Sequence, residues 1–274
     1  MNTPSELHTV NELTSFSVLS YGVVINIYCS ASVSSDIIKL AERAFPNNFA
    51  IRETADTSDH SFVIQEVNAD SFILLRDQDA PIQGLNKHTT FELFVRMIRL
   101  MVSEGAKEHV FLHAGVVALG NKTLILPGHS GSGKTSLVIE LLKLGAVYYS
   151  DEYAVLDKDG EVHPFARDLS VRSEKRNWNE KDGMPAVSYG GVSGTQSLPA
   201  GMVLFTEFSI KGDLNFERVS LGQGILAAIP HTITFPKRPD FSLKLLNCAF
   251  SRAIILTGLR CESDITAKHI TSLL

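Results

Sequence analysis

Cysteine is scarce in this sequence, and its placement excludes two kinds of structural support. The chain of 274 residues has three cysteines, Cys29, Cys248 and Cys261, which form no CxxC pair and lie far apart. A disulfide framework or a zinc site built on paired cysteines is therefore not indicated. Buried, reduced thiols are the simpler interpretation, because free cysteine packs as a small hydrophobic residue.

Clusters of basic residues and long apolar runs are also missing. The net charge is −5, and no run of Lys or Arg occurs, so neither nucleic acid nor an anionic membrane is expected as a partner. No apolar run approaches the roughly 20 residues that a membrane-spanning helix needs. The first residues, MNTPSELHTVNELTS, are polar and acidic and do not resemble a signal peptide. We expect a cytoplasmic location.

Hydrophobic residues are plentiful, and they predict a globular protein with two parts. They make up 44% of the chain, and charged residues make up 20%. The length suits a small domain joined to a larger one. We expect a small α+β domain over residues 1–108 and a larger domain over residues 109–274, an α/β fold with a mixed sheet.

The pattern in the first part predicts packing and no catalytic site. A loose tail is expected over residues 1–15, and Gly105 is expected to close the last helix. Apolar periodicity and turn residues place the remaining elements. These are one or two strands over residues 16–29, a helix capped by Ser35 or Asp36 that runs to Ala44, strands over 61–67 and 71–76, and a helix over 89–104.

The second part alternates strands and helices around one loop. Residues 173–198, which include Trp178, are predicted to form a loop. This loop either covers a substrate or is a plain surface loop. The expected elements are strands over 110–119 and 122–127, a helix over 134–144, strands over 146–150 and 153–157, strands in MVLFTEFSI and LNFERVSL, and a final helix, strand and helix over 245–274.

The segment GHSGSGKT fits a phosphate-binding loop. Gly128, Gly133, Lys134 and Thr135 fill every fixed position of G-x-x-x-x-G-K-[ST], between an apolar strand and a helix. Glycines let main-chain N–H groups face the phosphates, and the helix N-terminus adds a partial positive charge of about +0.5. Lys134 can bridge phosphates and Thr135 can hold Mg²⁺. The residues predicted to bind the nucleotide are Gly128, Ser130, Gly131, Ser132, Gly133, Lys134, Thr135 and Ser136.

The acidic pair Asp151-Glu152 is predicted to lie beside that loop. The helix from Lys134 rises roughly 16 Å at about 1.5 Å per residue, and the strand 146–150 returns roughly 16 Å at about 3.3 Å per residue. Asp151 should therefore emerge near the loop, at the carboxyl end of its strand, where α/β folds place ligands. One carboxylate can hold Mg²⁺ and the other can accept a proton. A solvated turn is the alternative.

Three further residues have two possible interpretations each. His113 lies late in the strand FLHAGVV and is either a core histidine or part of the site. Arg167 and Arg172, in PFARDLSVR, either contact a phosphate or lie on the surface.

The order FLHAGVVAL, LILPGHSGSGKTSLVIELLKLGA, YYSDEYAVL and PFARDLSVR resembles the HPr serine kinases and their stand-alone relatives. The resemblance covers residues 110–172 and implies a P-loop kinase core similar to phosphoenolpyruvate carboxykinase. It implies that Lys134 and the loop bind ATP, that Thr135 and Glu152 hold Mg²⁺, and that Asp151 is the general base. It also implies that His113 lies near the γ-phosphate.

Two departures from the family pattern bear on the substrate. The second acid is Glu152, where the family usually has Asp, and GMVLFTEFSIKG replaces the second signature of the HPr kinase/phosphorylases. The resemblance therefore favours the stand-alone kinases, some of which phosphorylate a serine of a precursor peptide. The hypothesis is an ATP- and Mg²⁺-dependent serine kinase of a peptide or protein, with a homo-oligomer left open. The alternatives are a small-metabolite kinase, a nucleotide-gated binding module and a simple hydrolase.

Overall fold

The computed structural model describes residues 13–172 and 181–273. The chain forms two compact units with a boundary between Lys107 and Glu108, which we describe separately. None of the helices in this described part combines the length and hydrophobicity that a membrane span requires.

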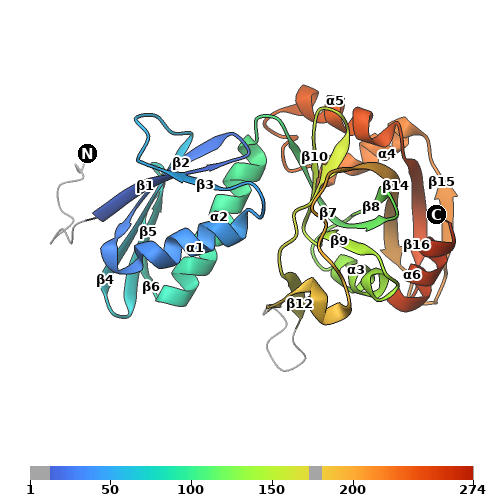
Figure 1. The fold of residues 1–274 in the computed structure, drawn as a ribbon, viewed down its shortest axis with the longest axis horizontal. Helices are drawn as coiled ribbons and strands as arrows, with labels where there is room; N and C mark the ends of the chain where they lie inside the picture. The colour runs from blue at the N-terminus through green and yellow to red at the C-terminus, as the bar shows by residue number, and fades with distance from the viewer. Residues whose placement is uncertain (1–12, 173–180, 274) are drawn as a thin grey trace. The chain divides into compact units, whose positions relative to one another are not determined.

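The N-terminal unit is a six-stranded sheet with two helices on one face (Figure 1). The strands lie in the order β3-β1-β2-β4-β5-β6, and β2 and β4 are parallel neighbours within it. The rings of Phe62 and Phe94 meet edge to face in the core between sheet and helix, 5.2 Å apart. The elements are β1 Leu13–Ser20, β2 Val23–Ser30, α1 Ser34–Ala44, β3 Ala50–Arg52, β4 His60–Asn68, β5 Ser71–Arg76, β6 Ile82–Leu85 and α2 Lys87–Gly105.

Both helices of this unit begin differently from the sequence prediction. Neither Ser35 nor Asp36 caps α1, because a 3-10 turn over Ala31–Val33 leads directly into the helix and places Val33 at the cap. The start of α2 is at Lys87 instead of Thr89, since the side chain of Asn86 accepts a hydrogen bond from the Thr89 N–H. Gly105 is the last residue of α2 and not the residue after it.

The predicted N-terminal tail is partly wrong. Leu13–Ser15 belong to strand β1, and the rest of the tail lies outside the described residues. The run from Phe16 to Cys29 does form two strands, which turn at Tyr21 and Gly22, both with positive φ.

The C-terminal unit is built on an eight-stranded mixed sheet. Its path is β11-β10-β7-β8-β14-β16-β15, and β9 pairs with β7 beside that path. The elements are β7 Val110–Leu119, β8 Lys122–Pro127, α3 Lys134–Lys143, β9 Val147–Ser150, β10 Tyr153–Leu156, β11 Glu161–His163, β12 Leu169–Arg172, β13 Lys181–Met184, β14 Leu198–Phe208, β15 Asn215–Arg218, α4 Leu221–Ala228, α5 Pro239–Phe250, β16 Ile254–Arg260 and α6 Ser263–Ser272.

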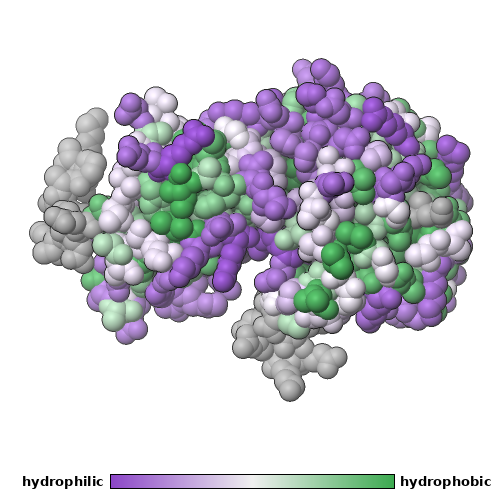
Figure 2. Space-filling model, viewed as in Figure 1, coloured by the Kyte–Doolittle hydropathy of each residue, from purple (hydrophilic) through white to green (hydrophobic). Residues whose placement is uncertain are grey.

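Apolar residues cover both faces of this sheet. Helices α4 and α5 contribute Ala228, Leu246 and Phe250 to one core, and α3 and α6 contribute Leu141 and Ile270 to the other. Strands β8, β14 and β16 run parallel between these layers, so their carboxyl ends meet at one edge. Figure 2 shows hydrophilic residues over the region of α5 and more hydrophobic ones lower on the same face.

The segment 173–198 is not one continuous loop, which corrects the sequence prediction. Lys181–Met184 form β13, which pairs with β12, and Ala186–Tyr189 form a 3-10 turn. Residues 173–180, and with them Trp178, lie outside the described residues. Helix α4 was not predicted, because Gly222 and Gly224 interrupt its apolar pattern, although Ser220 and Gln223 form a capping box at its start.

Candidate functional site

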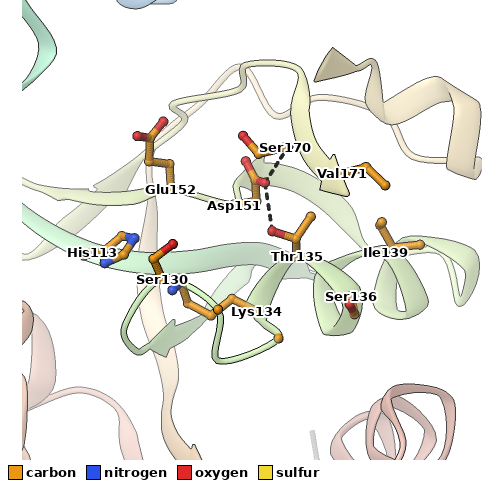
Figure 3. A pocket seen from close by; sticks show the side chains of 12 residues that line it. His113, Ser130, Lys134, Thr135, Ser136, Ile139, Asp151, Glu152, Ser170 and Val171 are labelled. Atoms are coloured by element: carbon orange, nitrogen blue, oxygen red, sulfur yellow. Dashed lines mark hydrogen bonds between the residues drawn. The ribbon is translucent and has the colours of Figure 1, made fainter. Parts of the chain in front are cut away.

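One pocket, of about 420 Å³, lies where β7, β8, α3 and the β9–β10 connection meet (Figure 3). Most of its lining residues are small or polar, and two are apolar. The lining consists of His113, Ser130, Gly131, Gly133, Lys134, Thr135, Ser136, Ile139, Asp151, Glu152, Ser170 and Val171.

Residues 128–133 form a glycine-rich loop that carries the chain from β8 into α3. Gly131 and Gly133 have φ values of 87° and 83°, which only glycine adopts without strain. Gly128 has a different reason, because a Cβ there would lie 2.8 Å from the hydroxyl oxygen of Ser132. The loop start is tied to β7, since the N–H of Gly128 donates to the carbonyl oxygen of His113 at 3.3 Å.

Lys134 is the first residue of α3, and its side chain folds back over the loop. Its Nζ donates to the carbonyl oxygens of Gly128 at 2.7 Å and His129 at 2.8 Å. The ammonium group and the first turn of α3 thus concentrate positive charge at one place. An anion placed there would meet both, which is the arrangement that binds phosphate at helix N-termini.

Asp151 and Glu152 lie at an interruption in strand pairing. One edge of β7 pairs with β10 from Val110 to His113 and with β9 from Val116 to Ala118, and the two acids lie between these partners. The N–H of Ala114 donates to the carbonyl oxygen of Glu152 across this gap. Both acids line the pocket, where the chain-length argument from the sequence places them.

Asp151 is buried and holds three hydrogen bonds. Its Oδ2 accepts from the hydroxyl of Thr135 at 3.1 Å and from the N–H of Ser170 at 2.9 Å, and its Oδ1 accepts from the hydroxyl of Tyr148 at 3.0 Å. Burial, and next the charge of Asp151, raise the pKa of Tyr148, so this phenol stays protonated as a donor. The carboxylate is therefore held in one orientation, toward Thr135 (Figure 3).

Glu152 has a different environment. Its Oε2 forms an ion pair with Nη1 of Arg167 at 2.5 Å, and both side chains are about a quarter exposed. Figure 3 shows Glu152 and His113 at one end of the pocket and Ile139 and Val171 at the other. Of the two acids, the structure shows Asp151 accepting a hydrogen bond from the hydroxyl of Thr135.

The predicted residues fall into four groups by position. Ser130, Gly131, Gly133, Lys134, Thr135, Ser136, His113 and both acids line the pocket, Gly128 and Ser132 support the loop from behind, and Arg167 contacts Glu152. The backbone of Arg172 pairs with Lys181 in the β12–β13 ladder, and its side chain lies outside the described part. Tyr148 and Ser170 were not predicted, because a buried donor in a strand leaves no pattern that distinguishes it from core.

Mg²⁺ fits the oxygens that this pocket offers. The hydroxyl of Thr135 and the carboxylate of Asp151 are hard ligands that lie within hydrogen-bonding distance of each other. Protein Mg²⁺ sites often use one or two such oxygens and complete the shell with water and phosphate. In the described residues, no cluster of three or more His, Cys, Asp or Glu side chains is arranged to hold a metal.

No protein-family model and no curated protein sequence matches the chain. Among solved structures, the chain is similar to the HPr(Ser) kinase/phosphatase from Coxiella burnetii. The similarity covers 60% of this chain and 93% of that chain, at 11% sequence identity and a TM-score of 0.32.

Proposed function

We propose that the protein is an ATP- and Mg²⁺-dependent kinase that transfers the γ-phosphoryl group to a hydroxyl, most simply a serine of a peptide or protein. The observation that carries the proposal is the hydrogen bond between Thr135 and Asp151 inside the pocket. It joins the glycine-rich loop, the helix N-terminus and an oriented carboxylate in one place. Those parts are what phosphoryl transfer requires, since its catalysis is mainly positioning and charge stabilisation.

The triphosphate is proposed to lie along the loop, with its γ end toward Ser130 and its α end toward Ser136. Lys134 would leave the carbonyl oxygens of Gly128 and His129 and donate to phosphate oxygens instead. The nucleoside would then extend out of the pocket on the side of Ile139, whose apolar side chain suits contact with the ring of the base.

Thr135 and Asp151 are proposed to hold Mg²⁺. The metal supplies charge that neutralises the phosphate oxygens when it is bound. Asp151 suits this role because its Oδ2 lies 3.1 Å from the hydroxyl oxygen of Thr135, so that one ion could contact both oxygens.

Glu152 is proposed as the group that takes the proton. The acceptor oxygen would attack the γ-phosphorus, the bond from that phosphorus to the β–γ bridging oxygen would break, and the hydroxyl proton would pass to the carboxylate of Glu152. Arg167 holds this carboxylate in place and brings a positive charge to the same end of the pocket. His113 lies at that end also (Figure 3).

The test compares Asp151→Asn with Glu152→Gln. Asp151→Asn is expected to weaken Mg²⁺-dependent ATP binding by at least about 10-fold, and Glu152→Gln to leave binding within about 2-fold while lowering turnover about 100-fold. Calorimetry measures binding, and mass spectrometry after incubation with ATP and serine peptides measures transfer. Asp264→Asn, an exposed acid on α6, is the matched control.

Three outcomes would change the proposal. The reverse pattern in the two variants would return the role of base to Asp151. Full biological activity of an Asp151→Asn protein that binds ATP normally would favour a nucleotide-gated binding module. ATP turnover that no peptide, protein or small hydroxyl compound changes would favour a simple hydrolase.

A further inference from the structure

Arg260 is a buried cation behind the glycine-rich loop. It is the last residue of β16, and it lies at the same sheet edge as the loop because β16, β14 and β8 run parallel. Only 4% of its surface is exposed, and it is not among the residues that line the pocket. Arg260 therefore acts on a ligand in the pocket through the loop and through its charge, without direct contact.

The guanidinium group is fixed against the point where the loop becomes helix α3. Nη2 donates to the carbonyl oxygen of Ser132 at 2.6 Å, and Nη1 donates to that of Cys261 at 3.3 Å. A Cβ on Gly133, the N-cap of α3, would lie 2.2 Å from Nη2, so arginine and glycine are closely matched. The guanidinium also lies over the ring of Phe208, 5.2 Å from its centroid.

These partners are neutral, and this is unusual for a buried charge. In the described part of the chain no carboxylate lies within ion-pair distance of Arg260, and the nearby charge of Glu262 acts only at longer range. Burial lowers the pKa of Arg260, although a guanidinium remains charged at any physiological pH. Packing alone does not explain this choice, because an apolar side chain of similar length avoids the cost of burying a charge.

We infer that Arg260 is a positioning residue for a polyphosphate ligand of the loop. It holds the Ser132 carbonyl away from the pocket, which keeps the neighbouring N–H groups directed into it, and its charge adds to those of Lys134 and the α3 N-terminus. A bound polyphosphate supplies the negative charge that the fold does not. The inference rests on the proposed function only in taking residues 128–133 as a phosphate site.

The experiment compares Arg260→Lys and Arg260→Met in the full chain, with Arg252→Met as control. Arg252 is half exposed and lies 3.6 Å from Glu161. The probes are ATP and inorganic tripolyphosphate, titrated by calorimetry at several salt concentrations. We expect Arg260→Met to weaken both probes about 30-fold and to reduce the salt dependence of binding. Arg260→Lys keeps the charge and loses the fork, so we expect a loss of roughly 5-fold with unchanged salt dependence.

A second measurement keeps the test decisive if Arg260→Met does not fold. Amide hydrogen exchange at residues 130–135 is expected to be faster in Arg260→Lys than in the wild type, with exchange in α5 unchanged. Equal tripolyphosphate affinity in wild type and Arg260→Lys, with equal exchange, overturns the inference. So does weaker binding in Arg260→Met with an unaltered salt dependence, because that result identifies a purely structural anchor. A wild type that binds neither probe removes the proposed function as well, whereas a wild type that binds while the variants match it removes only the role of Arg260.

Discussion

Buried polar residues are hydrogen-bonded in both units, but only the cluster in the C-terminal unit borders a pocket. In the N-terminal unit, Ser17 and Asn26 face each other across β1 and β2 and are both buried. The Ser17 hydroxyl donates to Asn26 at 2.5 Å, and both residues bond to the main chain of Ala55. Each polar group in this cluster finds its partner within the fold, so the cluster holds a loop onto a sheet.

The cluster around Asp151 in the C-terminal unit is open to a pocket on one side. Three donors orient the carboxylate, yet it still lines an open pocket together with Thr135 and Lys134. The contrast teaches that burial and hydrogen bonding alone do not identify a functional polar residue. What identifies it is an oriented charge beside a cavity that has room for a ligand.

The strongest way to test this contrast is to remove one lysine from each unit. Lys134→Met is expected to weaken ATP binding more than about 100-fold, because Lys134 is the only lysine or arginine among the described residues that line the pocket. Lys107→Met removes an exposed ion pair with Asp59, at 3.3 Å, and is expected to change ATP binding less than about 2-fold. Calorimetric titration of both variants with MgATP measures the difference, and similar losses would mean that the pocket is not the ATP site.

A smaller effect is expected from the Ser17–Asn26 cluster, where a substitution should lower stability and leave ATP affinity unchanged. Asn26→Ala leaves the Ser17 hydroxyl and the Ala55 carbonyl without their partner, which should lower the free energy of unfolding by about 2 kcal/mol. Urea titration followed by circular dichroism measures this loss. ATP affinity should stay close to that of the wild type under conditions where the variant is folded. A large loss of affinity would show that the N-terminal unit takes part in the site.

The smallest effect is expected in how the folding stability of each unit depends on pH. Burial lowers the pKa of His109 and His231 in the C-terminal unit, with further lowering by His163 for the first and by His129 and Lys134 for the second. Asp157 and Glu108 oppose the shift at His109. Because the unfolded state then binds protons more readily than the folded state, stability is lost as the pH falls below about 6.5, the ordinary histidine value.

In the N-terminal unit the corresponding group is a carboxylate. Burial alone would raise the pKa of Asp77, but hydrogen bonds from the Ser61 N–H and the His60 ring lower it. Its contribution is present above its ordinary value of about 3.8 and is lost below it. His231→Gln should therefore reduce the loss of stability between about pH 6.5 and 5, and Asp77→Asn should not. Urea titrations at a series of pH values test this. An equal change in the free energy of unfolding with pH in both variants would contradict it.

The parts of the fold that the sequence predicts are those with strong periodicity. The strands that contain His113 and Leu124 and the helix after Lys134 begin and end close to the predicted positions, because apolar spacing and glycine punctuation agree there. The chain-length argument also places Asp151 beside Thr135. Such arguments work when the elements involved are adjacent in the sequence.

What the sequence does not predict depends on contacts between distant segments. Arg260 lies 128 positions after Ser132, and no spacing rule connects them. The donors to Asp151 include Ser170, whose position depends on the β12–β13 ladder that the loop prediction missed. The contacts that distinguish Asp151 from Glu152 likewise depend on where each side chain points, and the sequence does not determine this for two adjacent acids.

The break in pairing along β7 makes the dipeptide 151–152 chemically adjustable. In an uninterrupted strand, neighbouring side chains point to opposite faces, and one of these acids would be turned into the core. Here residues 151 and 152 leave the strand conformation, although the N–H of Ala114 still donates to the carbonyl oxygen of Glu152. Regular pairing resumes at Tyr153, and both acids line the same pocket. Exchanging Asp for Glu, or Glu for Asp, at either position would change the length of the side chain by one methylene group without disturbing the sheet. The chemistry of the pocket can therefore change at these two positions while the fold stays the same.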